Sequence, residues 1–341
     1  MKLEDLEYIS VKFPDHFAAI AKLRTRACFY FETSAANHLI KNTPQEVIFN
    51  TRQYLERQGK AWLISPMTLW EFMLTGDELD TERLLFVAQR LFCTELLATP
   101  TERIVRYLQH AYPNNRGNYS YLSKTPLAAV WRRMTENDRV TLVYDKDALR
   151  DRTTLLRAAS KGLPKILGAA PVEPISDEPI VTLLADTCNS VLYLLRQDGV
   201  ELPSDDVVCR LVVVYVSLLL VLATDIDDDE FHRFRDEQGL ADNVTVDGML
   251  FYFTAFPRLF WQGPILEMAV MAAHQFVAGR RDRGILLDGM HMIYAPYCDF
   301  IMSADSGFVS VRESYPFYAG RVFSLSEAET VFVKVEASQE P

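Results

Sequence analysis

Hydrophobic and polar residues alternate in two different ways along this chain. Near the N-terminus, short apolar runs at residues 27–31 and 61–65 are each followed by helix-forming residues, at 35–55 and 67–74. A short apolar run bounded by polar or turn residues indicates a buried strand. Strands that alternate with helices predict a parallel sheet.

The middle of the chain, from residue 80 to about residue 283, has a largely helical pattern. Apolar residues recur there at intervals of three and four, which predicts amphipathic helices. These stretches are residues 81–98, 101–111, 145–166, 180–197 and 263–278. Residues 168–179 contain three prolines and predict a junction within the helical block.

The C-terminal part returns to short elements. Residues 288–297 predict a short helix and residues 300–304 a buried strand, and residues 321–325 and 330–336 predict strands that complete or edge the sheet. We therefore expect residues 1–78 and 284–341 to form one α/β domain, interrupted by a mainly helical insertion at 79–283.

Residues 207–224 form the most apolar stretch of the chain. A membrane-spanning helix needs about 20 consecutive apolar residues. Arg210 interrupts this stretch, so a buried core helix is favoured over a membrane span and we expect no stable membrane insertion.

Composition restricts the class of protein. With 341 residues, 49% of them hydrophobic, the chain can bury one large core or two smaller ones. Its five cysteines are far apart and its first residues are acidic, so we expect no disulfide framework, no export signal and a cytoplasmic location. The net charge of -11 argues against a surface built for non-specific binding of nucleic acid, so local basic patches would have to hold a nucleic-acid substrate.

Four carboxylates occupy informative positions. Glu32 and Asp305 directly follow predicted strands, and the carboxyl ends of parallel strands share one edge of a sheet. Glu71 lies just beyond the second strand, and Asp288 opens the helix that leads to the last one. That helix and that strand each span roughly 15 Å. If the strand runs back along the helix, Asp288 and Asp305 should lie close together.

Such a group of carboxylates is costly to keep ionised without a cation. Hard oxygen ligands suit Mg²⁺ or Mn²⁺, which would activate a water for phosphodiester hydrolysis. Each carboxylate also has a simpler interpretation as a helix N-cap or a solvated loop residue, and Glu71 as the partner of a nearby arginine.

Several further residues are candidates for contact with a polyanion. Arg280, Arg281 and Arg283 lie just upstream of Asp288, and His291 lies one helical turn after it. The alternatives are solvated surface charge for the arginines and a buried structural role for the histidine. Asp299 precedes the last strand rather than following it, so it is excluded from the candidate site.

Three segments, residues 29–34, 64–71 and 288–305, resemble the acidic motifs of PIN-like domains. The resemblance implies an α/β/α sandwich with a central parallel sheet that binds Mg²⁺ or Mn²⁺ and cleaves RNA or, in some members, DNA. It implies that Glu32 and Asp305 bind metal directly and that Asp288 binds metal or its water shell. Glu71 would position metal or the attacking water.

The sequence thus predicts a metal-dependent nuclease, with RNA favoured over DNA as substrate. A competing hypothesis is a catalytically silent PIN-like scaffold that binds a partner protein through its helical insertion, because Glu32 stands where the family usually has Asp. A third is a metal-dependent phosphatase of small phosphoesters, which would use the same carboxylates.

Overall fold

A computed structural model of the chain divides into two compact units. Unit 1 includes Pro100–Ser120 and Arg150–Ile293, and unit 2 includes Pro14–Thr99, Tyr121–Leu149 and Tyr294–Pro341. The structure describes residues 25–44, 53–74, 78–92, 95–111, 135–136, 139–142, 146–169, 179–224, 253, 255–280 and 284–327. The expected strand at 330–336 lies outside these residues.

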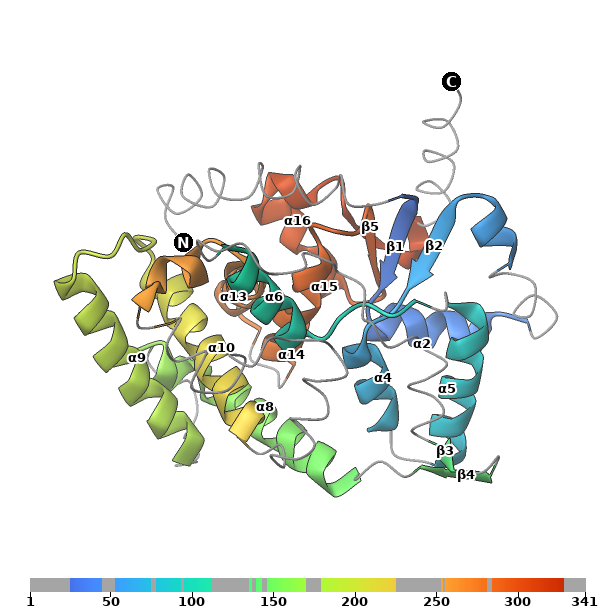
Figure 1. Ribbon diagram of the computed structural model, residues 1–341, viewed down its shortest axis with the longest axis horizontal. Coiled ribbons are helices and arrows are strands. Elements are labelled where there is room, and N and C mark those ends of the chain that lie inside the picture. Colours follow the sequence, from blue (N-terminus) through green and yellow to red (C-terminus); the bar gives the residue numbers. More distant parts are fainter. Residues whose placement is uncertain are drawn as a thin grey trace. The chain divides into compact units, whose positions relative to one another are not determined.

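Unit 2 contains a four-stranded parallel sheet in the order β2-β1-β5-β6, three strands of which are labelled in Figure 1. The strands are β1 (Ala27–Phe31), β2 (Lys60–Leu63), β5 (Phe300–Ser303) and β6 (Val322–Ser324). The helices are α2 (Thr33–Asn42), α4 (Pro66–Met73), α5 (Glu78–Leu91), α15 (Ser306–Val309), α16 (Val311–Ser314), η3 (Pro316–Tyr318) and η4 (Leu325–Glu327). A separate antiparallel pair consists of β3 (Thr135–Glu136) and β4 (Arg139–Leu142). The predicted α/β class and parallel sheet are confirmed.

Strand β1 lies inside the sheet and is buried on both faces. Phe29 and Phe31 belong to a core that includes side chains of α2, α4 and α5. On the other face the hydroxyl of Tyr30 lies 3.1 Å from that of Ser65, and its ring lies 4.9 Å from the ring of Tyr294. Burial on two faces explains why this strand reads as a continuous apolar run.

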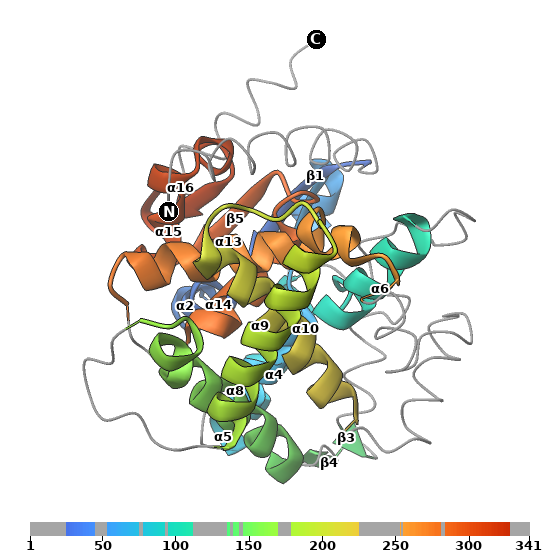
Figure 2. The ribbon, with the colours of Figure 1, turned by 90° about the vertical axis from the view of Figure 1, so that its left-hand side faces the viewer.

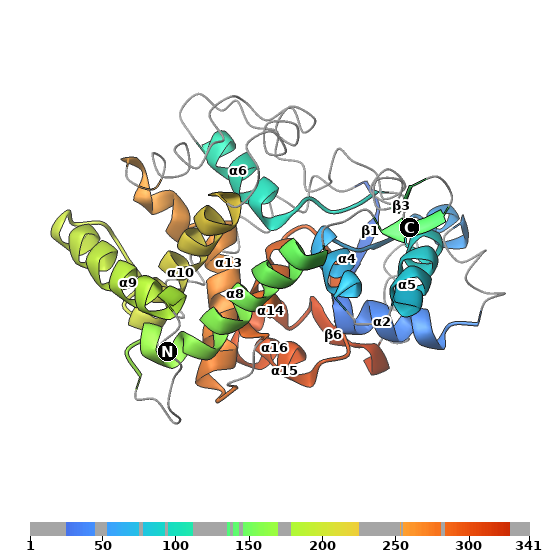
Figure 3. The ribbon, with the colours of Figure 1, turned by 90° about the horizontal axis from the view of Figure 1, so that it is seen from below.

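Helix α5 contributes side chains to the core of unit 2. Leu84, Leu85 and Ala88 of this helix belong to the same core as Phe29 and Phe31. Figure 3 shows α5 beside α2, against which it packs. Unit 2 includes residues up to Thr99, and α5 is part of it because the apolar face of this helix is buried in the same core as the sheet.

Unit 1 is helical in the part that the structure describes. Its elements are α6 (Pro100–Ala111), α8 (Lys146–Ile166), α9 (Pro179–Gln197), α10 (Asp206–Thr224), η1 (Pro257–Trp261), α13 (Pro264–Val277) and α14 (Ile285–His291), followed by η2 (Met292–Tyr294). Helices α9 and α10 pack side by side (Figure 2). The predicted helices at 101–111, 145–166, 180–197 and 263–278 are confirmed.

Helix α10 is the apolar stretch that the sequence favoured as a core helix. Val208, Leu211 and Leu218 are fully buried in it. No helix among the described residues combines the length and the apolar character that crossing a membrane requires.

Close packing at Gly289 holds α14 against α10 and α13. A Cβ atom at residue 289 would lie 2.0 Å from the hydroxyl oxygen of Tyr215 and 2.8 Å from the carbonyl oxygen of Met268. The Tyr215 hydroxyl donates a hydrogen bond of 3.0 Å to the carbonyl of Leu286. Only glycine therefore fits at this position without displacing a buried tyrosine or a helix backbone.

We predict that Gly289→Ala lowers the free energy of unfolding of unit 1 by about 1–3 kcal/mol, because overpacking forces neighbouring groups apart. Urea unfolding followed by tryptophan fluorescence measures the change. The control is Gly320→Ala, since no heavy atom lies within 4 Å of a Cβ atom built there. Equal stability of the two variants would contradict this account of α14 packing.

The carboxylate of Glu327 stabilises the end of β6 in unit 2 through hydrogen bonds. Glu327 accepts hydrogen bonds from Arg312 at 3.0 Å and from the backbone N–H of Ser324 at 2.8 Å. The hydrogen bond from Arg312 is the main cause that lowers the pKa of Glu327 from 4.5 to about 2, against a smaller opposing effect of burial.

The lowered pKa of Glu327 predicts how the free energy of unfolding depends on pH. Because the pKa of Glu327 is lower in the folded chain, its contribution is complete above pH 4.5 and is lost as the pH falls toward 2. Glu327→Gln should therefore lower the urea midpoint at pH 6, with a difference from the parent that shrinks below pH 4.5. The control is Glu313→Gln, which neutralises an exposed carboxylate on α16. A difference that does not change with pH would refute the role of the charge.

Candidate functional site

Glu32 follows β1 directly and forms the N-cap of α2. Its Oε2 accepts a hydrogen bond from the backbone N–H of Ser34 at 2.9 Å, and its Oε1 accepts one from that of Ala35 at 3.1 Å. The residue is only 5% exposed. The simpler interpretation of Glu32, as a helix cap, is confirmed, and the cap fixes the direction of the carboxylate.

Asp305 occupies the equivalent position after β5. It is the N-cap of α15, and its Oδ1 accepts hydrogen bonds from the backbone N–H groups of Gly307 at 2.6 Å and Phe308 at 3.3 Å. Strands β1 and β5 are parallel neighbours. Glu32 and Asp305 therefore lie at the same edge of the sheet, as predicted, and the strands that they follow are neighbours.

Two hydroxyl groups connect this edge to its neighbours. The Ser34 hydroxyl donates to Glu32 and accepts a hydrogen bond of 2.9 Å from the backbone N–H of Ala304, next to Asp305. The Thr33 hydroxyl donates to the carboxylate of Glu71 in α4. Hydrogen bonds thus connect the segments that carry Glu32, Glu71 and Asp305, which are three of the four predicted carboxylates. The sequence signal for these hydroxyls is the Glu-Thr-Ser order after the first strand.

Asp288 belongs to unit 1 and does not open its helix. Helix α14 begins at Ile285, and the backbone N–H of Asp288 already donates to the carbonyl of Gly284 at 2.8 Å. The helix starts earlier than predicted because the apolar residues 285–287 are buried within it. Since Asp305 lies in unit 2, the approach of these two carboxylates stays a prediction.

The charge of Asp288 is balanced within unit 1. Its Oδ2 accepts a hydrogen bond from Gln275 at 2.8 Å and lies 3.4 Å from Nη1 of Arg280. A guanidinium thus supplies positive charge where the sequence argument invoked a metal. Arg280, predicted to contact substrate, forms this ion pair instead of standing as isolated surface charge.

The remaining candidates for substrate contact are placed in part. Arg281 and Arg283 lie outside the described residues. His291 is 1% exposed, which agrees with the alternative of a buried structural histidine. Contact between His291 and a substrate stays a prediction.

The described residues contain no group of three or more His, Cys, Asp or Glu side chains arranged to hold a metal ion. The oxygen donors at the edge of the sheet are of the type that Mg²⁺ and Mn²⁺ prefer. The metal stays a prediction.

Asp299 lies at the opposite end of β5, as expected. Its Oδ2 accepts a hydrogen bond of 2.9 Å from the backbone N–H of Cys28, and its own N–H donates to the carbonyl of Cys28 at 2.9 Å. This carboxylate lies at the amino end of β5, whereas Asp305 follows its carboxyl end. Asp299 is therefore a matched control for Asp305.

Comparison with known proteins gave no match to any family model, curated protein or solved structure. The resemblance to PIN-like domains therefore depends on the three motifs alone. Any function must be argued from the geometry of the site.

We predict that Ser34→Ala lowers the free energy of unfolding by about 1 kcal/mol, because it removes a hydrogen bond to Glu32 and the acceptor for Ala304. Urea unfolding measures the change. The control is Ser326→Ala, since the exposed Ser326 bonds only the hydroxyl of Ser324 within the described residues. Identical midpoints for the two variants would show that the Ser34 link contributes nothing.

Proposed function

We propose that unit 2 is a metal-dependent nuclease that hydrolyses phosphodiester bonds, with RNA as the preferred polymer. One observation carries the proposal. Glu32 and Asp305 follow adjacent parallel strands, and the residue after Glu32 bonds the carboxylate of Glu71. Carboxyl ends of parallel strands are the usual position of ligand sites in open α/β sheets.

The donor set fits a hard divalent cation in chemical type. A carboxylate offers about four lone-pair positions, and three hydrogen bonds reach Glu32 from Ser34 and Ala35. Glu32 and Asp305 would hold the ion from two neighbouring strand ends. When bound, Mg²⁺ or Mn²⁺ lowers the pKa of a coordinated water and offsets charge on the phosphodiester.

The chain's own residues would orient the reaction. The helix N-termini of α2 and α15 hold the Glu32 and Asp305 carboxylates in place through backbone N–H groups. The Thr33 hydroxyl donates to one oxygen of Glu71, and this contact would orient the carboxylate to accept a proton from water. The proposal is limited to these three carboxylates, all of which lie in unit 2.

A catalytically silent scaffold is the second candidate. The observation that favours it is that Glu32 and Asp305 both serve as N-caps, a role that stabilises helices without any metal. In that case the same carboxylates would maintain the fold, and function would depend on a partner protein bound elsewhere.

The test is cleavage of labelled single-stranded RNA and DNA in Mg²⁺, Mn²⁺ or EDTA, with the parent chain and Asp305→Asn. Asparagine caps helices about as well as aspartate, so this change removes the charge while retaining the N-cap. We expect cleavage that EDTA abolishes and that Asp305→Asn reduces about 100-fold or more, since even residues that only orient metal ligands alter activity roughly 10–100-fold.

Asp299→Asn is the matched control, because it alters the same residue type at the opposite end of β5 and should retain activity. Hydrolysis of an aryl phosphate without cleavage of either polymer would instead identify a phosphatase. No metal-dependent hydrolysis by the parent chain, or equal activity of Asp305→Asn, would reject the enzyme and leave the scaffold.

A further inference from the structure

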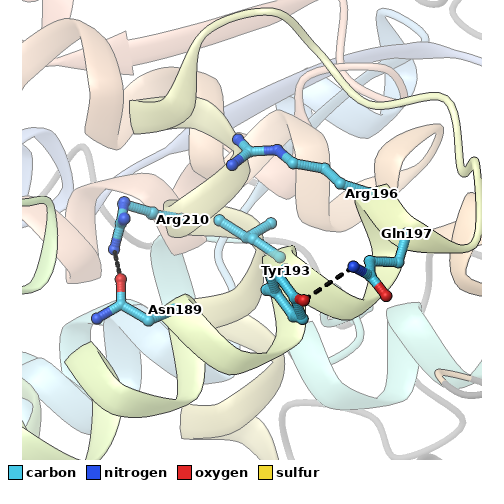
Figure 4. A pocket seen from close by; sticks show the side chains of 6 residues that line it. Asn189, Tyr193, Arg196, Gln197 and Arg210 are labelled. Atoms are coloured by element: carbon cyan, nitrogen blue, oxygen red, sulfur yellow. Dashed lines mark hydrogen bonds between the residues drawn. The ribbon is translucent and has the colours of Figure 1, made fainter.

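A pocket of about 570 Å³ lies between α9 and α10 in unit 1. This volume falls within the range of roughly 300–1,000 Å³ that is common for small-molecule sites. The side chains that line it, shown in Figure 4, are Asn189, Leu192, Tyr193, Arg196, Gln197 and Arg210. None of them belongs to the proposed nuclease site.

Two guanidinium groups of the pocket share a single carboxylate. Arg196 donates to Oδ1 of Asp206 at 2.6 Å, and Nε of Arg210 donates to Oδ2. Burial would raise the pKa of Asp206, but the hydrogen bonds from Arg210 and Arg196 outweigh it and lower that pKa. Asp206 therefore stays ionised and fixes both arginines, and the three charges sum to +1.

Most of the polar groups in the pocket that have no partner among the described residues are hydrogen-bond donors. Nη1 of Arg210 donates to Asn189 at 2.9 Å, which leaves the Asn189 amide N–H groups without a partner in the described residues. Gln197 donates to the Tyr193 hydroxyl at 2.8 Å, so that hydroxyl retains its own hydrogen to donate. In the same part of the chain, Arg196 has one bonded nitrogen, Nη2, and further N–H groups to offer.

The pocket also presents aromatic surface. Tyr193 is 61% exposed, and it lies next to the buried side chain of Leu192. An exposed tyrosine ring beside arginines is suited to stacking against a planar base. The ligand should therefore combine a single negative charge with an aromatic group.

We propose that this pocket binds a singly charged phosphodiester that carries a nucleobase. The net charge of +1 matches a monoanion, and the tetrahedral phosphate accepts from more directions than a planar carboxylate does. Arginine forks match the geometry of phosphate oxygens. This inference depends on α9 and α10 alone and is independent of the nuclease activity proposed for unit 2.

The test is isothermal titration calorimetry of the full chain with a dinucleoside monophosphate, which has one phosphodiester. The comparison ligands are its uncharged methylphosphonate analogue and benzoate, an aromatic carboxylate. We expect the charged dinucleotide to bind at least about tenfold more tightly than either comparison ligand, because charge-assisted hydrogen bonds are the stronger class.

Arg196→Gln is the informative variant, since its side chain is 54% exposed and can be changed without opening the core. It should weaken dinucleotide binding about tenfold or more. Arg210 is a poorer choice because it also donates to the carbonyl of Ile166. The matched control, Arg157→Gln, removes the same charge from an exposed position on α8 and should bind like the parent.

The outcomes separate clearly. Tighter binding of a longer single-stranded oligonucleotide would identify a polymer as the source of the phosphodiester, and equal affinity would identify a small free phosphodiester. Both results support the site. No binding by the parent chain, equal binding of the uncharged analogue or benzoate, or equal loss in Arg157→Gln would overturn the proposal.

Discussion

Strand β1 is enclosed on both edges and both faces. It pairs in parallel with β2 on one side and with β5 on the other, so segments distant in sequence complete its hydrogen bonds. Unpaired backbone groups in such a position would be costly, because water cannot reach them. This requirement places the ends of β1 and β5 together, and the positions of Glu32 and Asp305 follow from it.

At that edge the same carboxylates have two uses. Capping satisfies backbone N–H groups that α2 and α15 cannot pair internally, and it also holds each carboxylate in one orientation. Prearranged groups of this kind are what a catalytic site needs, since orientation is supplied by the fold. The structural and catalytic roles differ in what else the oxygens bind, and a helix cap is compatible with both.

Unit 1 compensates charge in two contrasting ways, one in a buried ion pair and one beside an exposed pocket. Glu102 and Arg106 form a buried ion pair on α6, in which burial lowers the pKa of Arg106 although Glu102 opposes that change. Such a pair compensates its own charge and mainly avoids the cost of an unpaired ion. At Asp206 two arginines meet one carboxylate, and the excess positive charge faces a pocket. This excess positive charge, rather than the ion pairs themselves, is the feature on which the proposed binding site depends.

The sequence by itself determined the four strands of the parallel sheet, most of the long helices and the parallel class of that sheet, because burial imposes a recognisable period on apolar residues. It also placed Glu32 and Asp305 directly after predicted strands, and the structure showed that these strands are neighbours. Tertiary structure decided the rest: that α5 joins the core of unit 2, that Ser34 bridges Glu32 and Ala304, and that Arg280 pairs with Asp288. Periodicity records how deeply a side chain is buried, whereas these contacts depend on which buried or charged groups the folded chain brings together.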